Sequence, residues 1–232
     1  MKTTLGEVCA FNPRIPFLEP LPDDTEVSFV PMAAVEEESG RLDASQTRTL
    51  GSVRRGYTPF IENDVIFAKI TPCMENGKIA LATGLKNGLA YGSTEFFVFR
   101  PYDGLLPRFV LHFLLQPSLR EDAEHQMAGA SGQKRVPASY LLNHEFSLPP
   151  TREQERILAK LDATLSRLER AETASRRARE RVPPVVPPLT LDGSHCYKLF
   201  VATKKVNSFG IKQIHALCAK HPGWGYLHKA PL

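Results

Sequence analysis

The chain has 232 residues, of which 42% are hydrophobic and 23% are charged, a composition typical of a globular protein rather than a disordered polymer. No apolar run approaches the roughly 18 residues of a membrane helix, and the first residues lack an apolar stretch long enough for a secretory signal, so we expect a cytoplasmic protein. The net charge of +4 is compatible with a polyanionic partner but does not require one.

The first 150 residues predict an α+β domain in which short β-rich runs alternate with turn formers. The predicted strands are residues 26–35, ended by Pro31, then 64–70, 77–83 and 93–101, and a short one at 145–148. The runs 64–70 and 77–83 should pair around the loop between them. Adjacent aromatic residues in 93–101 predict burial on both faces. Residues 36–60 show no sustained period and predict a long surface excursion.

Two helices are predicted after the strands. Apolar residues recur at helical spacing in residues 107–116, with Pro107 suited to the first turn, and Pro117 then restarts or kinks the helix. A more polar helix should follow and end at Gly129. The residues from there to 150 are predicted as a loop with one short strand.

Residues 151–182 predict one long helix, about 45 Å in length at 1.5 Å per residue. Thr151 and Gln154 have the spacing of a capping box at its start. Leucines then recur at spacings of three and four, with charged residues between them, which predicts a coiled-coil seam for oligomerisation formed by Leu158, Leu161, Leu165 and Leu168. A helix lying on its own domain would show a wider apolar stripe, to which only Ile157 adds a residue.

The last part of the chain, residues 183–232, is predicted as a Pro-rich tail. Prolines at 183, 184, 187 and 188 cannot continue a helix, and no clear period follows them. Our hypothesis is that a frame change truncated a longer gene after the helix. His215, Cys218 and His221 have a spacing that a metal site could use, but no metal site is predicted in a segment without a period. The four scattered cysteines lack CxxC spacing and are expected to be reduced thiols.

No catalytic motif or cofactor site is predicted. Gly77-Lys78 has no glycine five residues earlier, so there is no Walker phosphate loop, and neither GxGxxG nor an Asp/Asn-Pro-Pro-Tyr motif occurs. Phe67 stands where a nuclease-like site following Asp64 would need a carboxylate. The chain is predicted to be non-catalytic.

Four segments, in this order and spacing, resemble the specificity (S) subunit of bacterial type I restriction-modification systems. They are DVIFAKITPCMENGKIA, GSTEFFVFRP, GASGQKRVP and SLPPTREQERILAKLDATLSRLE. The resemblance covers roughly residues 1–182, as one target recognition domain and one spacer helix. It implies a domain that reads half of a split DNA sequence in the major groove and a helix that pairs antiparallel with a counterpart to set the spacing. It also implies docking of adenine methyltransferase (M) and endonuclease-translocase (R) subunits.

The chain departs from that family in carrying one such unit where S subunits normally carry two in tandem. A half subunit of this kind resembles those that pair with themselves, which implies a homodimer that reads an inverted repeat. The competing interpretation is a truncated coiled-coil scaffold or interaction protein that does not bind DNA.

Candidate DNA-binding residues follow from position on loops and from side-chain chemistry. They are Arg54 and Arg55 in the long excursion, Lys69, Thr71, Asn76 and Lys78 around the loop between paired strands, and Ser131, Gln133, Lys134 and Arg135 beside two glycines. Each group has a structural alternative: a solvated basic turn for the first, Thr-Pro and Asn-Gly turn chemistry for the second, and a hinge for the third. Arg176, Arg177, Arg179 and Arg181 make a basic helix end, for which a solvated charge run is the alternative.

Overall fold

The computed structural model describes residues 2–16, 21–129 and 132–181, and side chains of the last helix as far as residue 178. The chain divides into two compact units, Met1–Glu172 and Thr173–Leu232, and of the second only the end of that helix is described. The predicted tail and its candidate metal ligands lie outside the described residues.

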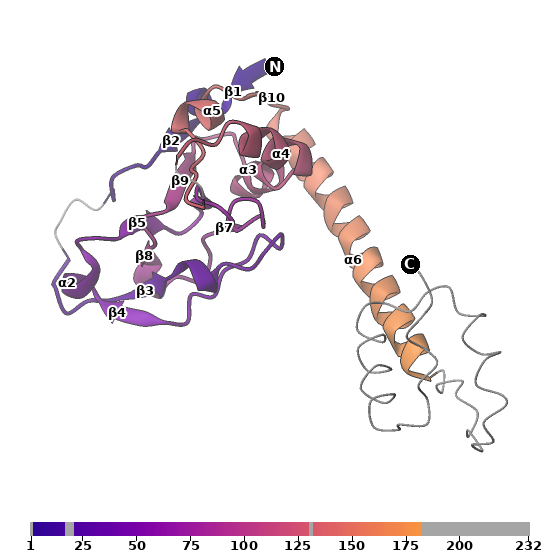
Figure 1. Cartoon of the computed structure of the whole chain (residues 1–232), viewed down its shortest axis with the longest axis horizontal. Coiled ribbons are helices and arrows are strands. Elements are labelled where there is room, and N and C mark those ends of the chain that lie inside the picture. The colour runs from indigo at the N-terminus through magenta and orange to yellow at the C-terminus, as the bar shows by residue number, and fades with distance from the viewer. Residues whose placement is uncertain (1, 17–20, 130–131, 182–232) are drawn as a thin grey trace, which may run out of the picture. The chain divides into compact units, whose positions relative to one another are not determined.

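The first unit places its strands mainly before residue 102 and its longer helices after it (Figure 1). The strands are β1 (Lys2–Thr4), β2 (Cys9–Phe11), β3 (Glu26–Val30), β4 (Thr47–Thr49), β5 (Thr58–Ile61), β6 (Val65–Ala68), β7 (Ile79–Leu81), β8 (Leu89–Gly92), β9 (Phe96–Pro101) and β10 (Glu145–Ser147). The helices are α1 (Leu5–Val8), α2 (Leu50–Val53), α3 (Pro107–Leu114), α4 (Pro117–His125), α5 (Ala138–Leu142) and α6 (Thr151–Arg181), with 3-10 turns η1 (Met32–Ala34) and η2 (Lys86–Gly88).

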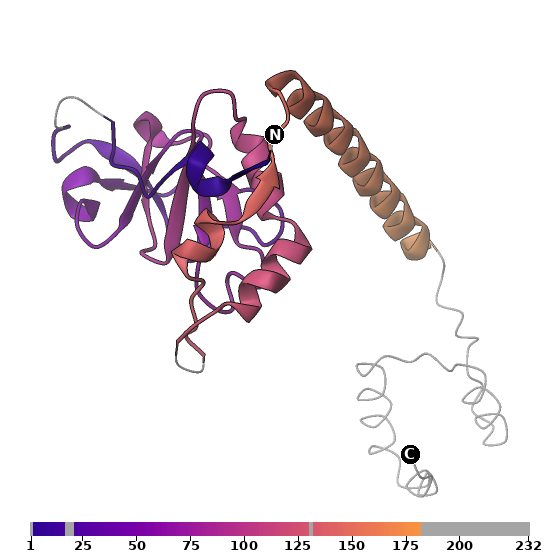
Figure 2. The same cartoon turned by 90° about the horizontal axis from the view of Figure 1, so that it is seen from above.

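The strands form two four-stranded sheets and one short pair within the described part of the chain. One sheet has the order β2-β9-β6-β7 and is antiparallel throughout. The other has the order β4-β3-β8-β5, with β3 and β8 parallel. The separate pair joins β1 to β10, so the start of the unit lies beside the segment that leads into α6 (Figure 2).

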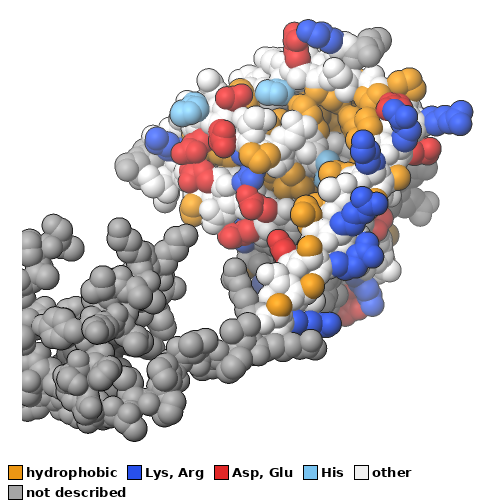
Figure 3. Space-filling view, turned by 90° about the vertical axis from the view of Figure 1, so that its right-hand side faces the viewer, with side chains coloured by type: hydrophobic (Ala, Val, Ile, Leu, Met, Phe, Trp, Pro, Cys, Tyr) orange, Lys and Arg blue, Asp and Glu red, His pale blue; other side chains and the backbone are white. Residues whose placement is uncertain are grey.

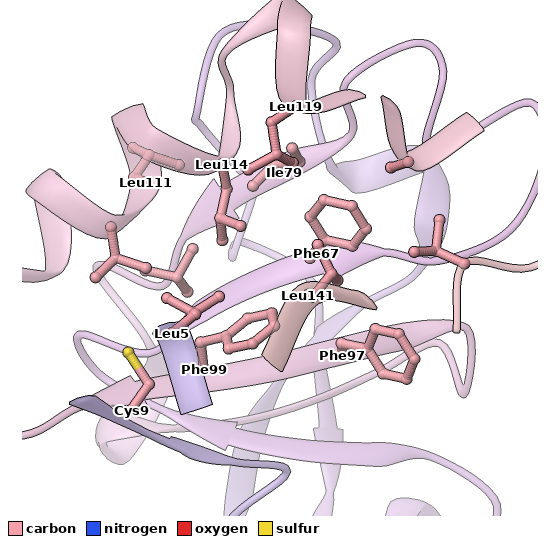
Figure 4. Close-up of a cluster of buried hydrophobic side chains, with 14 of the residues drawn as sticks. Leu5, Cys9, Phe67, Ile79, Phe97, Phe99, Leu111, Leu114, Leu119 and Leu141 are labelled. Atoms are coloured by element: carbon pink, nitrogen blue, oxygen red, sulfur yellow. The ribbon is translucent and has the colours of Figure 1, made fainter. Parts of the chain in front are cut away.

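The strands β6 and β9 lie at the centre because both of their faces are covered. Along β6, Val65 and Phe67 pack beneath the helices, whereas Ile66 and Ala68 pack between the two sheets. This is the two-residue alternation of a strand, with apolar residues on both sides. Figure 4 shows the helix-side cluster, in which Phe67 and Phe99 from the sheet lie close to leucines from the helices. A third cluster packs α2 on the outer face of the second sheet.

Most of the predicted elements are confirmed. The strand β3 ends immediately before Pro31, β6 pairs with β7, and the apolar residues of β9 are buried on both faces. The helices α3 and α4 begin at Pro107 and Pro117. The prediction of a mixed α+β body therefore holds.

The prediction of a long surface excursion over residues 36–60 without regular elements is wrong in part. This segment contains β4, which pairs with β3, the helix α2, and the start of β5, which pairs with β8. The elements are only three or four residues long, so they are too short to show a period in the sequence. The short helix α5 and the strand β8 were not predicted for the same reason.

The capping box predicted at Thr151 and Gln154 is also wrong. The first helical amide bonds are accepted by the carbonyl of Pro150, so Thr151 already belongs to the helix and cannot act as its cap. The Gln154 side chain is fully buried and binds the turn before α3 instead. Its Oε1 accepts from the Leu106 amide (2.9 Å), and its Nε2 donates to the carbonyls of Gly104 and Pro149 (both 2.9 Å).

One face of α6 continues this contact with the body for two more turns. Leu158, one turn after Gln154, is 6% exposed. One turn further, Asp162 accepts two hydrogen bonds from Arg108 of α3, at 3.0 and 2.6 Å. We call Gln154, Leu158 and Asp162 the anchor face. It fixes the direction in which α6 leaves the body as far as Glu172.

Replacing Gln154 with Ala should destabilise the protein by about 2–4 kcal/mol, because it leaves the partly buried amide of Leu106 and the carbonyl of Pro149 without their partner. Urea unfolding of the full chain measures this loss. Gln126→Ala, at an exposed position that ends α4, is the matched control and should be nearly neutral. Equal stability of the two variants would contradict the anchoring role of Gln154.

Candidate nucleic-acid interface

Two segments far apart in the sequence meet at one end of the central sheet. Because Ala68 pairs with Phe96, Lys69 lies directly beside Glu95 as the two strands end. The chain from residues 128 to 136 adds to this edge through an isolated bridge between Ile70 and Arg135. We call residues 69–76 and 128–136 the loop pair. Residues 130 and 131 of the loop pair, and with them the candidate Ser131, lie outside the described residues.

Hydrogen bonds between the two loops hold Thr71 against Lys134. The Thr71 amide donates to the Lys134 carbonyl (3.1 Å), and the Lys134 amide donates to the Thr71 hydroxyl (3.1 Å). The Val136 amide donates to the carbonyl of Lys69 (2.9 Å). Four candidates from two separate groups, Lys69, Thr71, Lys134 and Arg135, are therefore brought together.

The charges of the loop pair are partly neutralised within the chain. Arg135 donates to both carboxylate oxygens of Glu95, at 2.9 and 2.8 Å. These bonds hold the pKa of Glu95 below its ordinary value and raise that of Arg135. Lys69 donates to the carbonyl of Thr94 (2.9 Å) and lies over the ring of Phe97. Arg135 and Lys69 therefore form bonds within the chain that hold the conformation of the loops.

Lys134 and Gln133 are two of the exposed polar side chains of this edge. Within the described part of the chain, the Lys134 ammonium makes no ion pair, so its charge is available to a partner. A hollow beside it is lined by Thr71, Glu75, Glu124, His125, Met127, Gly132 and Lys134. The acidic residues of this hollow limit the positive surface to the Lys134 side.

The side chains of Asn76 and Lys78 form hydrogen bonds within the chain. The Asn76 amide donates to Glu37 (2.9 Å), and the Lys78 ammonium donates to the carbonyl of Val35 (2.8 Å) with its side chain only 16% exposed. Between them, Gly77 has a φ of +63°, and an added Cβ would lie 3.0 Å from Arg120. These contacts agree with the structural alternative, turn chemistry, for both residues.

Arg54 and Arg55 directly follow α2, which packs on the second sheet, away from the loop pair in sheet order. Arg54 donates to the Leu21 carbonyl (2.8 Å) and pairs with Asp23 (3.1 Å), whereas Arg55 is exposed. Sequence reasoning missed Arg48 of the edge strand β4, whose guanidinium lies 3.7 Å from the centre of the Phe29 ring. All three residues of β4, Thr-Arg-Thr, are exposed in the structure, and this exposure could not be recognised from so short a run in the sequence. The structure thus separates the candidates into two basic regions.

The leucines assigned to oligomerisation divide into two kinds. Leu158 belongs to the anchor face and is buried within the single chain, so its assignment to pairing is corrected. Leu161 is half-buried, whereas Leu165 and Leu168 are 42% and 55% exposed. Ile157, 41% exposed, lies beside them on the helix. The side chains of Arg179 and Arg181 lie outside the described residues, and Arg176 and Arg177 are exposed.

Among the described residues no group of His, Cys, Asp and Glu side chains could hold a metal ion, and no helix is both long and apolar enough to cross a membrane. Cys9 and Cys73 are free thiols, and burial raises the pKa of Cys9 to about 12. That thiol is therefore protonated and unreactive at neutral pH.

Comparisons with known proteins agree over the body and α6. A family model described as "Type I restriction modification DNA specificity domain" matches residues 1–175. The chain is 36% identical over 174 residues to the type I restriction enzyme EcoAI specificity subunit of Escherichia coli, and 38% identical over 156 residues to the EcoEI specificity subunit of the same organism. These matches cover 75% and 67% of this chain but only 29% and 26% of the two relatives, so the chain spans less than a third of their length.

Solved structures show the same fold at low sequence identity. The HsdS subunit from Thermoanaerobacter tengcongensis matches with a TM-score of 0.61 at 22% identity, over 78% of this chain and 45% of that one. A chain from a structural study of complex assembly and conformational transition of the type I R-M system gives the same TM-score at 21% identity, over 83% and 50% of the two chains.

The Glu95–Arg135 pair should control how firmly the loop pair is closed. Glu95→Gln removes the charge that Arg135 binds, so amide hydrogen exchange at Ala128 and Arg135 should become faster while the amides of β6 and β9 stay protected. Because the pair is partly exposed, global stability should change by less than about 1 kcal/mol. Glu121→Gln, at an exposed position of α4, is the control. Unchanged hydrogen exchange at Ala128 and Arg135 would show that the Glu95–Arg135 pair does not hold the loop pair closed.

Proposed function

Because the chain belongs to the type I restriction-modification DNA specificity domain family, we propose that it is the DNA-recognition component of such a complex. It binds double-stranded DNA at a defined sequence and directs adenine methylation and restriction by M and R partner subunits. The observation that carries the proposal is the family match over residues 1–175, which includes the body and most of α6. The prediction of this family is confirmed by that match. The prediction of a non-catalytic chain is confirmed by the names of the relatives, which are specificity subunits.

The loop pair supports a role in DNA contact. It presents Lys134 and Gln133 on an exposed edge whose shape is fixed by the bonds to Thr71 and by the Glu95–Arg135 pair. A lysine supplies a phosphate contact, and a glutamine can read a base edge by donating and accepting together. The second basic region, with Arg48 and Arg55, supplies further cations at α2 and β4.

The mechanism is geometric, since the chain contributes binding and its partner contributes the chemistry. Recognition of a sequence by the body places the M subunit over a target adenine, which that partner extrudes from the duplex and methylates with its own cofactor. The anchor face keeps α6 in one orientation relative to the body, because three consecutive turns of the helix are attached to it.

We propose the domain limits that the sequence indicated: residues 1–150 as the recognition domain, residues 151–182 as the spacer helix, and residues 183–232 as a tail. We propose that the helix pairs with that of a second copy through Leu161, Leu165 and Leu168, as a coiled coil in a homodimer. The exposure of Leu165 and Leu168 supports this, because a single chain leaves them in water. The same exposure is also expected of the alternative, a coiled-coil scaffold that does not bind DNA.

DNA binding is tested by selection of duplexes from a random library with the purified full chain, followed by salt titration of the selected sequence. Affinity should fall linearly on a log-log plot, and Lys134→Ala should lower the slope by about 0.9 for one lost phosphate contact. Lys2→Ala, at an exposed position of β1, is the control and should leave the slope unchanged. No enriched sequence and no salt-dependent affinity would contradict DNA recognition and leave the scaffold.

Pairing is tested by replacing Leu165 and Leu168 with Asp. Two carboxylates in an apolar seam cannot be buried without a large desolvation penalty, so light scattering should show a change from dimer to monomer. The folded body should persist, since neither residue belongs to the anchor face. Ser166→Asp, on another side of the same helix, should keep the dimer. An unchanged mass for the leucine variant would show that these leucines of α6 do not form the dimer interface.

A further inference from the structure

The helix α6 carries a row of cations on one side. Arg152, Arg156, Lys160, Arg167 and Arg170 are all exposed, and we call them the cationic stripe. At 3.6 residues per turn they lie within an arc of about 80° and extend along about 27 Å of the axis. Between residues 151 and 172, Ala163 is the other residue of this arc, and no carboxylate lies in it.

The cationic stripe lies nearly opposite the leucines. Leu161, Leu165 and Leu168 are centred roughly 150° away around the helix. Pairing through the leucines therefore leaves the stripe exposed. Figure 3 shows a row of Lys and Arg side chains along one side of α6 and hydrophobic side chains along another. The acidic residues Asp162 and Glu169 lie on a third side of the helix.

Few cations of the stripe form ion pairs or side-chain hydrogen bonds with other groups of the chain. Glu153, at the border of the arc, accepts from Arg156 (2.8 Å), and the Nε of Arg170 donates to the carbonyl of Ser166 (2.9 Å). No ion pair is formed by Arg152, Lys160 or Arg167 within the described part of the chain. Like charges on neighbouring turns repel one another, so the row costs stability unless an anionic partner is bound.

The chemistry of the stripe fits a polyanion better than a protein surface. Protein interfaces depend on a few large apolar or aromatic anchors, and this arc contains only cations and a small alanine. Duplex DNA presents one phosphate charge per about 1.7 Å of its axis, so a straight row of about 27 Å can face several phosphates at once.

We propose that the cationic stripe binds the phosphate backbone of double-stranded DNA without regard to base sequence, beside the bases that the body recognises. This rests on the proposed function and adds a second contact, made by the spacer helix itself. The spacer would then both set the distance between recognition bodies and contribute to affinity. It would favour duplexes that continue past the recognised bases.

The test uses the full chain and a random-sequence duplex of about 30 base pairs, because a backbone contact needs no particular sequence. Arg167→Gln with Arg170→Gln should lower the log-log salt slope by about 1.8 and weaken binding at least tenfold at low salt. The control is Lys2→Gln with Arg41→Gln, which removes two exposed cations of the body outside the candidate DNA-binding groups and should have little effect. For the double variant, light scattering should be unchanged and urea unfolding should show no loss of stability, because only repulsion between like charges is removed.

The outcomes separate this inference from the proposed function. Loss of binding to the random duplex in the stripe variant supports the inference even where no sequence is selected by the body. Unchanged affinity and slope in that variant overturn it, although sequence selection through Lys134 then still stands. Equal or tighter binding of poly-glutamate by the wild type, lost in the same variant, would overturn it in favour of an acidic protein partner.

Discussion

The direction in which α6 leaves the body depends on the hydrogen bonds of one buried side chain, that of Gln154. A helix that projects from a domain transmits a direction only when its first turns are held, and Gln154 holds them with three hydrogen bonds to the chain segments at residues 104–106 and 149. Leu158 and the Arg108–Asp162 pair extend the attachment along the next two turns. The position of the body thereby sets the orientation of α6.

The elements that the sequence could predict are those with a long period or a strong boundary. Three features were enough to predict that these elements exist. They are the apolar runs at β6 and β9, the prolines that begin α3 and α4, and the leucine spacing of α6. The short elements β4, α2 and α5 were not, because three to five residues carry no measurable period. Their conformation depends on pairing and packing with residues far away in the chain.

The candidate site was predictable in residue type but not in arrangement. Lys69 and Arg135 were chosen for their charge, yet both are tied inside the chain, to Thr94 and Glu95. Gln154 was placed in a cap because its spacing from Thr151 fits one, while its actual partners lie some 50 residues earlier. Long-range partners decide which polar groups stay unpaired at the surface, and the spacing of residues in a single sequence does not reveal those partners.

Two sides of α6 differ in their chemistry. The anchor face binds the body, the exposed Leu165 and Leu168 continue along nearly the same side beyond it, and the cationic stripe lies on the opposite side. A regular helix can support both because its side chains point outward in fixed directions. The narrow apolar stripe, too narrow for an ordinary core, follows from this division of one surface.

The most direct measurement is adenine-methylation mapping of the host genome with and without the gene, together with mass spectrometry of proteins that co-purify with the tagged chain. The account predicts that an adenine methyltransferase co-purifies and that one methylated motif disappears when the gene is removed. An unchanged pattern of methylation with no such partner would contradict it.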